Sequence, residues 1–304
     1  MALDVVTGAS GYTGRYIARR LLDAGREVRT LTGHPGRPMP FAEPIEVLPY
    51  RFDDEAELAR SLEGATTLYN TYWVRFGWRG VGFDQAVERS LALFRAARNA
   101  GVERIVHVSI TNPSLDSPLP YFRGKAVVER GLEQSGVPWS VVRPTVVFGL
   151  EDIMVNNIAW LLRRVPLFAL PRRGAMLVRP VFVDDVARVC VEAAGGPDGS
   201  VIDAVGPEVF TFRQMVETIR AAVGSRSRLV PLPSSAVTGL ARMIGLAVQD
   251  VLLTPQELAG LLAGLVTSDG PTTGHTSFSH WVAANGNALG RRYASELARH
   301  FRAA

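Results

Sequence analysis

Two side chains with complementary acid–base chemistry lie four residues apart in the stretch Tyr121-Phe-Arg-Gly-Lys125. In a helix this spacing puts both on one face. A phenol with a pKa near ~10 exchanges protons poorly at neutral pH, and a nearby ammonium stabilises the phenolate and brings that pKa closer to neutrality. Ser109, whose hydroxyl can donate a hydrogen bond, precedes Tyr121 by 12 residues. These three residues predict a site for proton transfer.

Lys125 is the only lysine among 33 basic residues, so the other 32 are arginine. Lysine provides a compact ammonium on a flexible stem, which arginine does not reproduce. This composition favours a chemical role for Lys125. The alternative is an ion pair with Glu129 one helical turn away, which has the less favourable orientation and would contribute only about 0.2–0.5 kcal/mol.

A glycine loop near the N-terminus follows a short apolar strand, residues 3–7, and precedes an amphipathic helix. Glycines in this position allow the backbone to approach a pyrophosphate, and the free N–H groups that open the helix point at its oxygens. The spacing of Gly8, Gly11 and Gly14 inside one β-α-β unit therefore indicates a bound dinucleotide rather than an empty turn. The residues expected to contact it here are Gly8, Ser10, Gly11, Tyr12, Thr13 and Gly14.

The choice of dinucleotide depends on the end of the second strand, where a ribose-binding carboxylate is expected about 20 residues beyond the loop. That place reads Leu31-Thr32-Gly-His34-Pro-Gly-Arg37 and contains no Asp or Glu. Thr32 would border the ribose, and His34 and Arg37 could face a 2′-phosphate. The stretch favours NADP, with NAD and an ordinary exposed loop as the alternatives.

Strands and helices alternate along the first half of the chain. Strands are expected at 27–31, 45–48, 67–70, 104–109 and 139–143, and helices at 54–62, 83–100 and 121–135. Such alternation predicts an α/β fold of the Rossmann type, a doubly wound parallel sheet with helices on both faces. A smaller, mostly helical C-terminal substrate lobe should follow.

The expected domain boundaries follow the weakening of this pattern. Residues 1–150 should form the dinucleotide-binding core, and residues 181–210 should return to it. Residues 151–180 and 211–304 should form the substrate or lid region. Asp184 would cap a helix over 186–194.

Composition excludes several other classes of protein. The net charge is +4, but the arginines form no run longer than two, so no nucleic-acid partner is expected. The single Cys190 suits a reducing compartment and a buried role. No signal peptide and no membrane-spanning run is seen, so a cytoplasmic location is expected. No metal site is expected, because the histidines of the tail lack partners at ligand spacing. The apolar stretches 236–248 and 252–266 suggest a helical lid or, less favoured, a peripheral membrane surface.

The Tyr121-x-x-x-Lys125 motif with Ser109 upstream resembles the short-chain dehydrogenase/reductase superfamily. Further stretches, such as Arg143-Pro-Thr-Val-Val-Phe-Gly149 and Val183-Asp-Asp-Val-Ala187, are similar to its atypical and extended branches. These branches include NAD-dependent epimerase/dehydratase and NmrA-like proteins and the NADPH-binding accessory subunit of respiratory complex I. The resemblance covers residues 1 to about 210.

The resemblance implies roles for individual positions. Tyr121 would be the acid/base, Ser109 would polarise the substrate oxygen, and Lys125 would also bind the nicotinamide ribose. Asn70, Thr71 and Tyr72 would border the riboses, and Phe52 and Asp53 would flank the adenine. Backbone groups near the nicotinamide amide would come from Pro144, Thr145 and Val146. The substrate pocket would be lined by Tyr72, Trp73, Asn156 and Asn157, although Tyr72 and Trp73 could equally be core aromatics.

The sequence therefore predicts an NAD(P)-dependent oxidoreductase or epimerase/dehydratase-like enzyme. Its substrate would be a small molecule with a carbonyl or hydroxyl group, and the protein would be a monomer or a homodimer. The alternative is a non-catalytic NAD(P)H-binding redox sensor or accessory protein, which the glycine loop supports equally.

Overall fold

The computed structural model describes residues 2–78 and 80–301, and the chain forms two compact units. The first unit runs to Pro144 and includes Val183–Ala204. The second contains Thr145–Phe182 and the chain from Val205 onward. The sequence suggests boundaries at 150, 181 and 210, whereas the division falls a few residues away from each.

The first unit is built on a seven-stranded, wholly parallel sheet in the order β11-β6-β5-β4-β1-β2-β3. The strands are β1 (Leu3–Thr7), β2 (Glu27–Thr32), β3 (Glu46–Pro49), β4 (Ala65–Asn70), β5 (Arg104–Val108), β6 (Trp139–Pro144) and β11 (Ser200–Ala204). The strand order reverses between β1 and β4. Ligands of doubly wound sheets bind at such a point, beyond the carboxyl ends of the strands.

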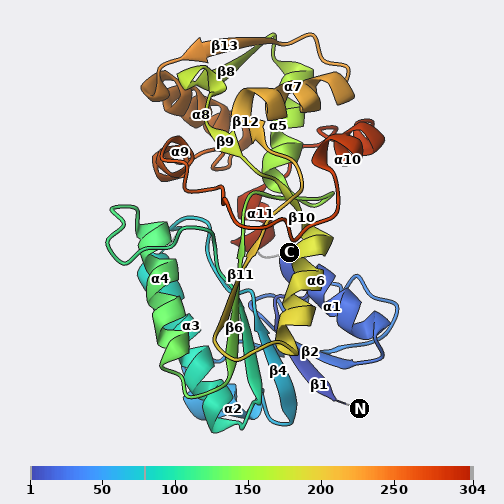
Figure 1. Ribbon diagram of the computed structural model, residues 1–304, viewed down its shortest axis with the longest axis vertical. Coiled ribbons are helices and arrows are strands. Elements are labelled where there is room, and N and C mark those ends of the chain that lie inside the picture. Colours follow the sequence, from blue (N-terminus) through green and yellow to red (C-terminus); the bar gives the residue numbers. More distant parts are fainter. Residues whose placement is uncertain (1, 79, 302–304) are drawn as a thin grey trace. The chain divides into compact units, whose positions relative to one another are not determined.

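Helices cover both faces of this sheet, as expected for a Rossmann fold (Figure 1). One face carries α1 (Thr13–Asp23) packed on α6 (Val183–Ala194), and the other carries α2 (Glu55–Arg60), α3 (Phe83–Asn99) and α4 (Pro120–Glu133). Leu68, Leu93 and Ile105 are fully buried between the sheet and this second layer. The fold class predicted from the sequence is confirmed.

One helix start differs from the expectation. The helix expected at 186–194 begins at Val183, so Asp184 lies inside its first turn and is not its N-cap. The carboxylate of Asp184 instead accepts two hydrogen bonds of 2.7 Å from Arg20 on α1. Cys190 lies fully buried in the same helix, and burial raises the pKa of its thiol. This cysteine is therefore a packing residue, as its position in the sequence suggests.

The second unit combines helices with three two-stranded sheets. The strand pairs are β7 (Val147–Phe148) with β10 (Val181–Phe182), β8 (Leu167–Pro171) with β13 (Arg228–Leu232), and β9 (Leu177–Val178) with β12 (Phe210–Thr211). The helices are α5 (Ile153–Arg164), α7 (Phe212–Ala222), α8 (Ser234–Val248), α9 (Pro255–Leu262), α10 (Phe278–Asn285) and α11 (Glu296–His300). Its core includes Phe148, Ile219 and Phe278.

Candidate functional site

The glycine loop forms a tight turn between β1 and α1. Gly8 has a φ of +69°, which favours glycine, and its N–H donates to the Leu31 carbonyl at 2.8 Å. A Cβ atom on Gly14 would lie 2.5 Å from the Gly8 oxygen and 2.9 Å from the Thr7 oxygen. Both obstacles are backbone atoms, so only glycine lets α1 approach β1 this closely.

No side chain caps the start of α1 in the described residues, so its first backbone amides can donate to a ligand. Tyr12 is the N-cap residue and makes no side-chain capping bond, and the first turn contains no acidic residue. The opening amides of a helix need an acceptor, and a phosphate group satisfies that need. The loop and this helix end have the geometry that the spacing of the glycines predicts for a pyrophosphate site.

Two side-chain bonds join the carboxyl ends of β1 and β4. The Thr71 amide donates to Thr7 Oγ1 at 2.7 Å, and Thr71 Oγ1 donates to the Thr7 carbonyl at 2.6 Å. Asn70 is fully buried, and its Oδ1 accepts from the Tyr72 amide at 3.1 Å. The side-chain amide of Asn70 therefore stabilises the turn beneath the candidate ribose site through its own hydrogen bonds. Thr71 lies next to the glycine loop.

A buried histidine, His107, contacts Asn70, although its sequence position alone did not mark it as a site residue. His107 on β5 lies opposite Asn70 in the sheet register, and Asn70 Nδ2 lies 3.1 Å from His107 Nδ1. Burial first, then the charge of Lys125, lowers the pKa of His107 well below its usual value, so the ring is neutral. The signal in the sequence is its position two residues before Ser109, which puts both side chains on the same face of one strand.

The loop after β2 contains the residues expected near a 2′-phosphate. Thr32 is buried at the end of β2, and its Oγ1 accepts from the His34 amide at 3.1 Å. The Arg37 amide donates to the His34 carbonyl at 3.0 Å, which closes a turn. His34 and Arg37 are both partly exposed, so the loop presents them at the surface beside β2.

An aromatic cluster lies beyond β3 and β4, where the adenine is expected. The rings of Tyr50 and Phe52 stack with centroids 4.8 Å apart, and Tyr72 meets both at 5.3 and 5.4 Å. The guanidinium of Arg89 lies 5.0 Å from the Phe52 ring and donates to the Tyr72 hydroxyl at 3.1 Å. Phe52 and Tyr72 are therefore together in space, while Asp53 is exposed beside them.

Lys125 is buried, with 2% of its surface exposed, yet no ion pair holds it in the described residues. Its Nζ donates to the Val108 carbonyl at 2.8 Å and lies 4.5 Å from the centroid of the Trp73 ring. Glu129 does not take the ammonium, because its carboxylate binds the Arg143 guanidinium through both oxygens. The structure thus excludes the Lys125–Glu129 ion pair as the explanation for this lysine.

Burial lowers the pKa of Lys125 from 10.5 to about 7, and the charge of Glu129 opposes this shift. The neutral and charged forms are therefore both accessible near pH 7. A buried ammonium with one neutral acceptor and an aromatic face is poorly compensated. Such a cation gains from any further acceptor oxygens that a ligand brings.

Tyr121 lies one turn before Lys125 on α4 and shares an aromatic neighbour with it. The ring of Tyr121 meets the edges of Trp73 at 5.9 Å and Phe83 at 5.7 Å. A Cβ atom on Gly124 would lie 3.0 Å from Trp73, so this glycine makes room for the indole. Trp73 therefore links the phenol and the ammonium.

Ser109 directly follows β5, next to the carbonyl that holds Lys125. Its side chain is 5% exposed, and its Oγ finds no hydrogen-bond partner among residues 2–78 and 80–301. Within the same described residues, the indole Nε1 of Trp73 is also buried without a partner. Buried polar atoms without partners are uncommon in folded proteins and often mark a functional site. Both donors are available to a bound oxygen atom.

The division between the units falls inside the segment expected near the nicotinamide amide, between Pro144 and Thr145. The Pro144 carbonyl accepts from the Thr111 amide at 3.3 Å. Thr145 is buried and donates from Oγ1 to the Arg179 carbonyl at 2.5 Å, and Val146 follows it partly buried.

The two asparagines expected in the substrate pocket lie on α5 in the second unit. Asn157 binds Ala294 in both directions, Nδ2 to its carbonyl and Oδ1 to its amide, each at 2.9 Å. Asn156 Nδ2 donates to the Arg292 carbonyl at 2.9 Å, and its Oδ1 accepts from the Gly290 amide at 3.0 Å. These amides hold residues 290–294 against α5, so they are committed to the fold.

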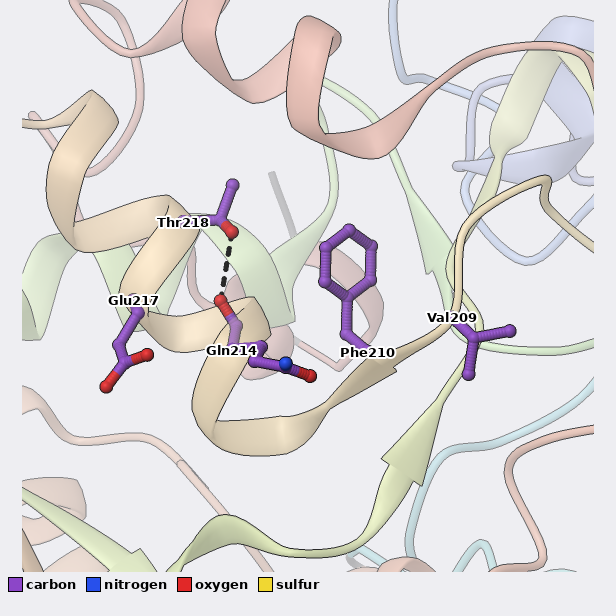
Figure 2. Close-up of a pocket in the computed structure, with 5 residues that line it drawn as sticks. All are labelled: Val209, Phe210, Gln214, Glu217 and Thr218. Carbon is purple, nitrogen blue, oxygen red and sulfur yellow. Dashed lines mark hydrogen bonds between the residues drawn. The ribbon is translucent and has the colours of Figure 1, made fainter.

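A pocket of about 490 Å³ lies elsewhere in the second unit, at the start of α7 (Figure 2). It is lined by Val209, Phe210, Gln214, Glu217 and Thr218, none of which the sequence singled out. Gln214 already closes a capping box with Thr211. The pocket has no buried donor or acceptor of the kind found around Lys125, so it offers no comparable chemistry.

Residues 4–258 match the NmrA-like family, which is most of the chain. The chain belongs to the NmrA-like family. This finding confirms the resemblance stated on the motifs around Tyr121 and Lys125.

Two differently named proteins are among the curated relatives of this chain. One is the mitochondrial NADH dehydrogenase (ubiquinone) 1 alpha subcomplex subunit 9, with the Arabidopsis thaliana protein 28% identical over 75% of this chain and 60% of its own length. The other is a (4-alkanoyl-5-oxo-2,5-dihydrofuran-3-yl)methyl phosphate reductase of Streptomyces griseus, 28% identical over 94% of this chain and 98% of its own. The chain thus spans about 60% of the Arabidopsis relative and nearly all of the Streptomyces one.

Solved structures share the fold. The NADPH-dependent quinone oxidoreductase of Escherichia coli, complexed with NADPH, matches 93% of this chain and 99% of its own with a TM-score of 0.75 and 20% identity. The triphenylmethane reductase of Citrobacter sp., complexed with NADP(H), matches 94% of this chain and 100% of its own with a TM-score of 0.71 and 14% identity. Across residues 2–78 and 80–301, no helix combines the length and the apolar character needed to cross a membrane.

Proposed function

We propose that this protein is an NAD(P)-dependent oxidoreductase or epimerase/dehydratase-like enzyme that acts on a small carbonyl or hydroxyl substrate. The observation that carries the proposal is the environment of Lys125, a buried ammonium next to Ser109 and one helical turn from Tyr121. Near full-length similarity to a reductase supports the same class of reaction.

The residues of the first unit fit a dinucleotide. The pyrophosphate would lie on the loop of Gly8, Gly11 and Gly14, where a Cβ on Gly14 would collide with the backbone. The riboses would be bordered by Thr71 and Tyr72, with Asn70 holding the turn beneath them. The adenine would lie by Phe52 and Asp53, and the nicotinamide amide would face the backbone of Pro144 at the end of β6.

NADPH should bind more tightly than NADH, because Arg37 and His34 follow β2 where a ribose-binding carboxylate would otherwise stand. An Arg37→Ala variant should lower NADPH affinity about 10- to 100-fold and leave NADH affinity unchanged, since a charge-assisted contact to phosphate is worth roughly 1.5–3 kcal/mol. Fluorescence titration with both nucleotides measures this. Tighter NADH binding by the unmodified protein would reverse the assignment.

The bound dinucleotide supplies the hydride, and the residues of this chain manage the proton and the substrate oxygen. Tyr121 would give a proton to that oxygen on reduction and take it back on oxidation. Ser109 Oγ and the indole Nε1 of Trp73 are buried donors that would be available to the substrate. The Lys125 ammonium would stabilise the Tyr121 phenolate and bind ribose hydroxyls in addition to the Val108 carbonyl.

A Tyr121→Phe variant should lower kcat about 100- to 10,000-fold, the usual contribution of a positioned general acid or base. Cofactor affinity should change little, because the phenyl ring preserves the contacts with Trp73 and Phe83. Steady-state kinetics with a panel of small aldehydes, ketones and quinones provides the measurement. Turnover at the original rate would exclude the phenol as the acid/base.

A second candidate is a non-catalytic NAD(P)H-binding protein, a redox sensor or an accessory protein. The observation that favours it is the set of relatives that are named as subunits of NADH dehydrogenase. In that case NADPH would bind as above, no substrate of the panel would turn over, and the Tyr121→Phe change would be silent. A cytoplasmic location and a monomeric or homodimeric state remain predictions for both candidates.

A further inference from the structure

Large apolar side chains occupy much of the exposed face of α8 in the second unit. The helix packs inward through Val237, Ala241 and Gly245, which are buried. Its opposite face presents Met243 at 69% and Leu246 at 74% exposure, with Leu240 at 39%. Figure 1 shows α8 beside β8, the strand that it contacts.

This distribution is the reverse of that in an ordinary surface helix, whose outward face is polar. Three and four residues separate neighbours on one face, so Ala236, Gly239, Met243 and Leu246 form a continuous outward stripe. A continuous apolar stripe on the outer face of a helix favours a binding partner that covers it. The contacts of α8 within its own unit account only for the inner face.

The net charge of the second unit favours an anionic partner for this face. This unit has 14 arginines against eight Asp and Glu residues, a formal charge of +6, whereas the first unit has 19 basic and 21 acidic residues, a formal charge of −2. Arg242 is exposed on α8 itself, one turn before Leu246. On the neighbouring strands the exposed Arg228 of β13 pairs in register with Leu167 of β8, which is 55% exposed.

We propose that α8 is an interfacial helix through which this protein binds the surface of an anionic lipid bilayer. Met243 and Leu246 would enter the boundary between headgroups and acyl chains, and Arg242 would meet the lipid phosphates. Helices that lie in a membrane surface combine an apolar face with basic residues in this way. Each arginine near an anionic surface adds to the attraction, and salt screens it. The inference goes beyond the proposed enzymatic function and does not depend on it.

Vesicle flotation with the full chain tests the proposal. The protein should float with vesicles that contain phosphatidylglycerol, much less with pure phosphatidylcholine, and should be released at high salt. A Met243→Ser, Leu246→Ser double variant should lower the bound fraction about tenfold or more. Arg242→Gln should reduce the preference for anionic vesicles several-fold.

The control is Val201→Ser on β11 of the first unit, which removes an exposed apolar side chain (44%) outside α8 and should float like the unmodified protein. Circular dichroism and thermal melting of every variant verify that each is folded. Equal flotation of the double variant would overturn the proposal. A second result would also overturn it: the unmodified protein does not bind vesicles but oligomerises, and the double variant is monomeric. In that case a second copy of the chain would cover α8.

Discussion

A Lys125→Met variant is expected to bind NADPH about 10- to 100-fold more weakly and, without cofactor, to melt a few degrees higher than the unmodified protein. The first effect follows from the loss of a charged donor to the ribose hydroxyls. The second follows from the removal of a buried cation that the Val108 carbonyl and the Trp73 ring compensate incompletely. Methionine fills a similar volume without that desolvation cost. Titration and thermal melting of the free protein measure the two effects.

The pH dependence of this stabilisation has a definite sign. Burial lowers the pKa of Lys125 to about 7 in the folded protein, from 10.5 in the unfolded chain. The folded state of the unmodified protein therefore loses stability as the pH falls from about 10.5 to about 7. The advantage of methionine should be largest below pH 7 and should disappear above pH 10.5. NADPH affinity of the unmodified protein should decline above about pH 7, because the ligand binds the ammonium form.

Lys125→Arg is the matched control that keeps the charge. Its planar guanidinium cannot occupy the space between Trp73 and the Val108 carbonyl in the way the ammonium does, so it should not restore tight cofactor binding. Weaker binding by the methionine variant with no gain in melting temperature would mean that the ammonium is well compensated in the free protein. Undiminished NADPH affinity of the methionine variant would remove Lys125 from the cofactor site.

Replacing Gly14 with alanine should abolish measurable dinucleotide binding and destabilise the protein by about 2–3 kcal/mol. The new Cβ would stand 2.5 Å from the Gly8 oxygen and 2.9 Å from the Thr7 oxygen, so α1 would have to move away from β1. That movement would displace the loop and the helix end that hold the pyrophosphate. Chemical denaturation and NADPH titration measure both consequences.

Gly239→Ala provides a control with the same chemical change. Gly239 lies in the middle of α8, and an added Cβ there meets no atom within 4 Å. Alanine should therefore stabilise this helix by up to about 1 kcal/mol and leave NADPH affinity unchanged. If Gly14→Ala bound NADPH normally, the cofactor could not lie on this loop as proposed.

Local patterns account for the parts of the protein that were predicted well. Alternating strands and helices, together with a glycine loop directly after the first strand, determine a Rossmann sheet with its ligand edge at the carboxyl ends. These patterns involve residues close together in the sequence, so they can be recognised without knowledge of long-range contacts. The motif of Tyr121 and Lys125 was enough to indicate the superfamily, and the NmrA-like match agrees with it.

Other features depend on partners far apart in the sequence. The sequence suggests that Asp184 is a helix cap, whereas in the structure it binds Arg20, which is 164 residues away. Asn156 and Asn157 read as pocket residues, yet they bind backbone groups of residues 290–294. A polar side chain can bind a ligand or hold the protein backbone, and the tertiary contacts determine which of these it does.

Lys125 shows the division most clearly. The amino-acid sequence shows a single lysine one helical turn after a tyrosine, in a chain whose other basic residues are arginine. The folded structure adds that Glu129 binds Arg143, that the ammonium contacts the Val108 carbonyl and Trp73, and that burial lowers the pKa of Lys125. The physical reason is that a pKa depends on burial and on charges from several elements, which a local pattern does not contain.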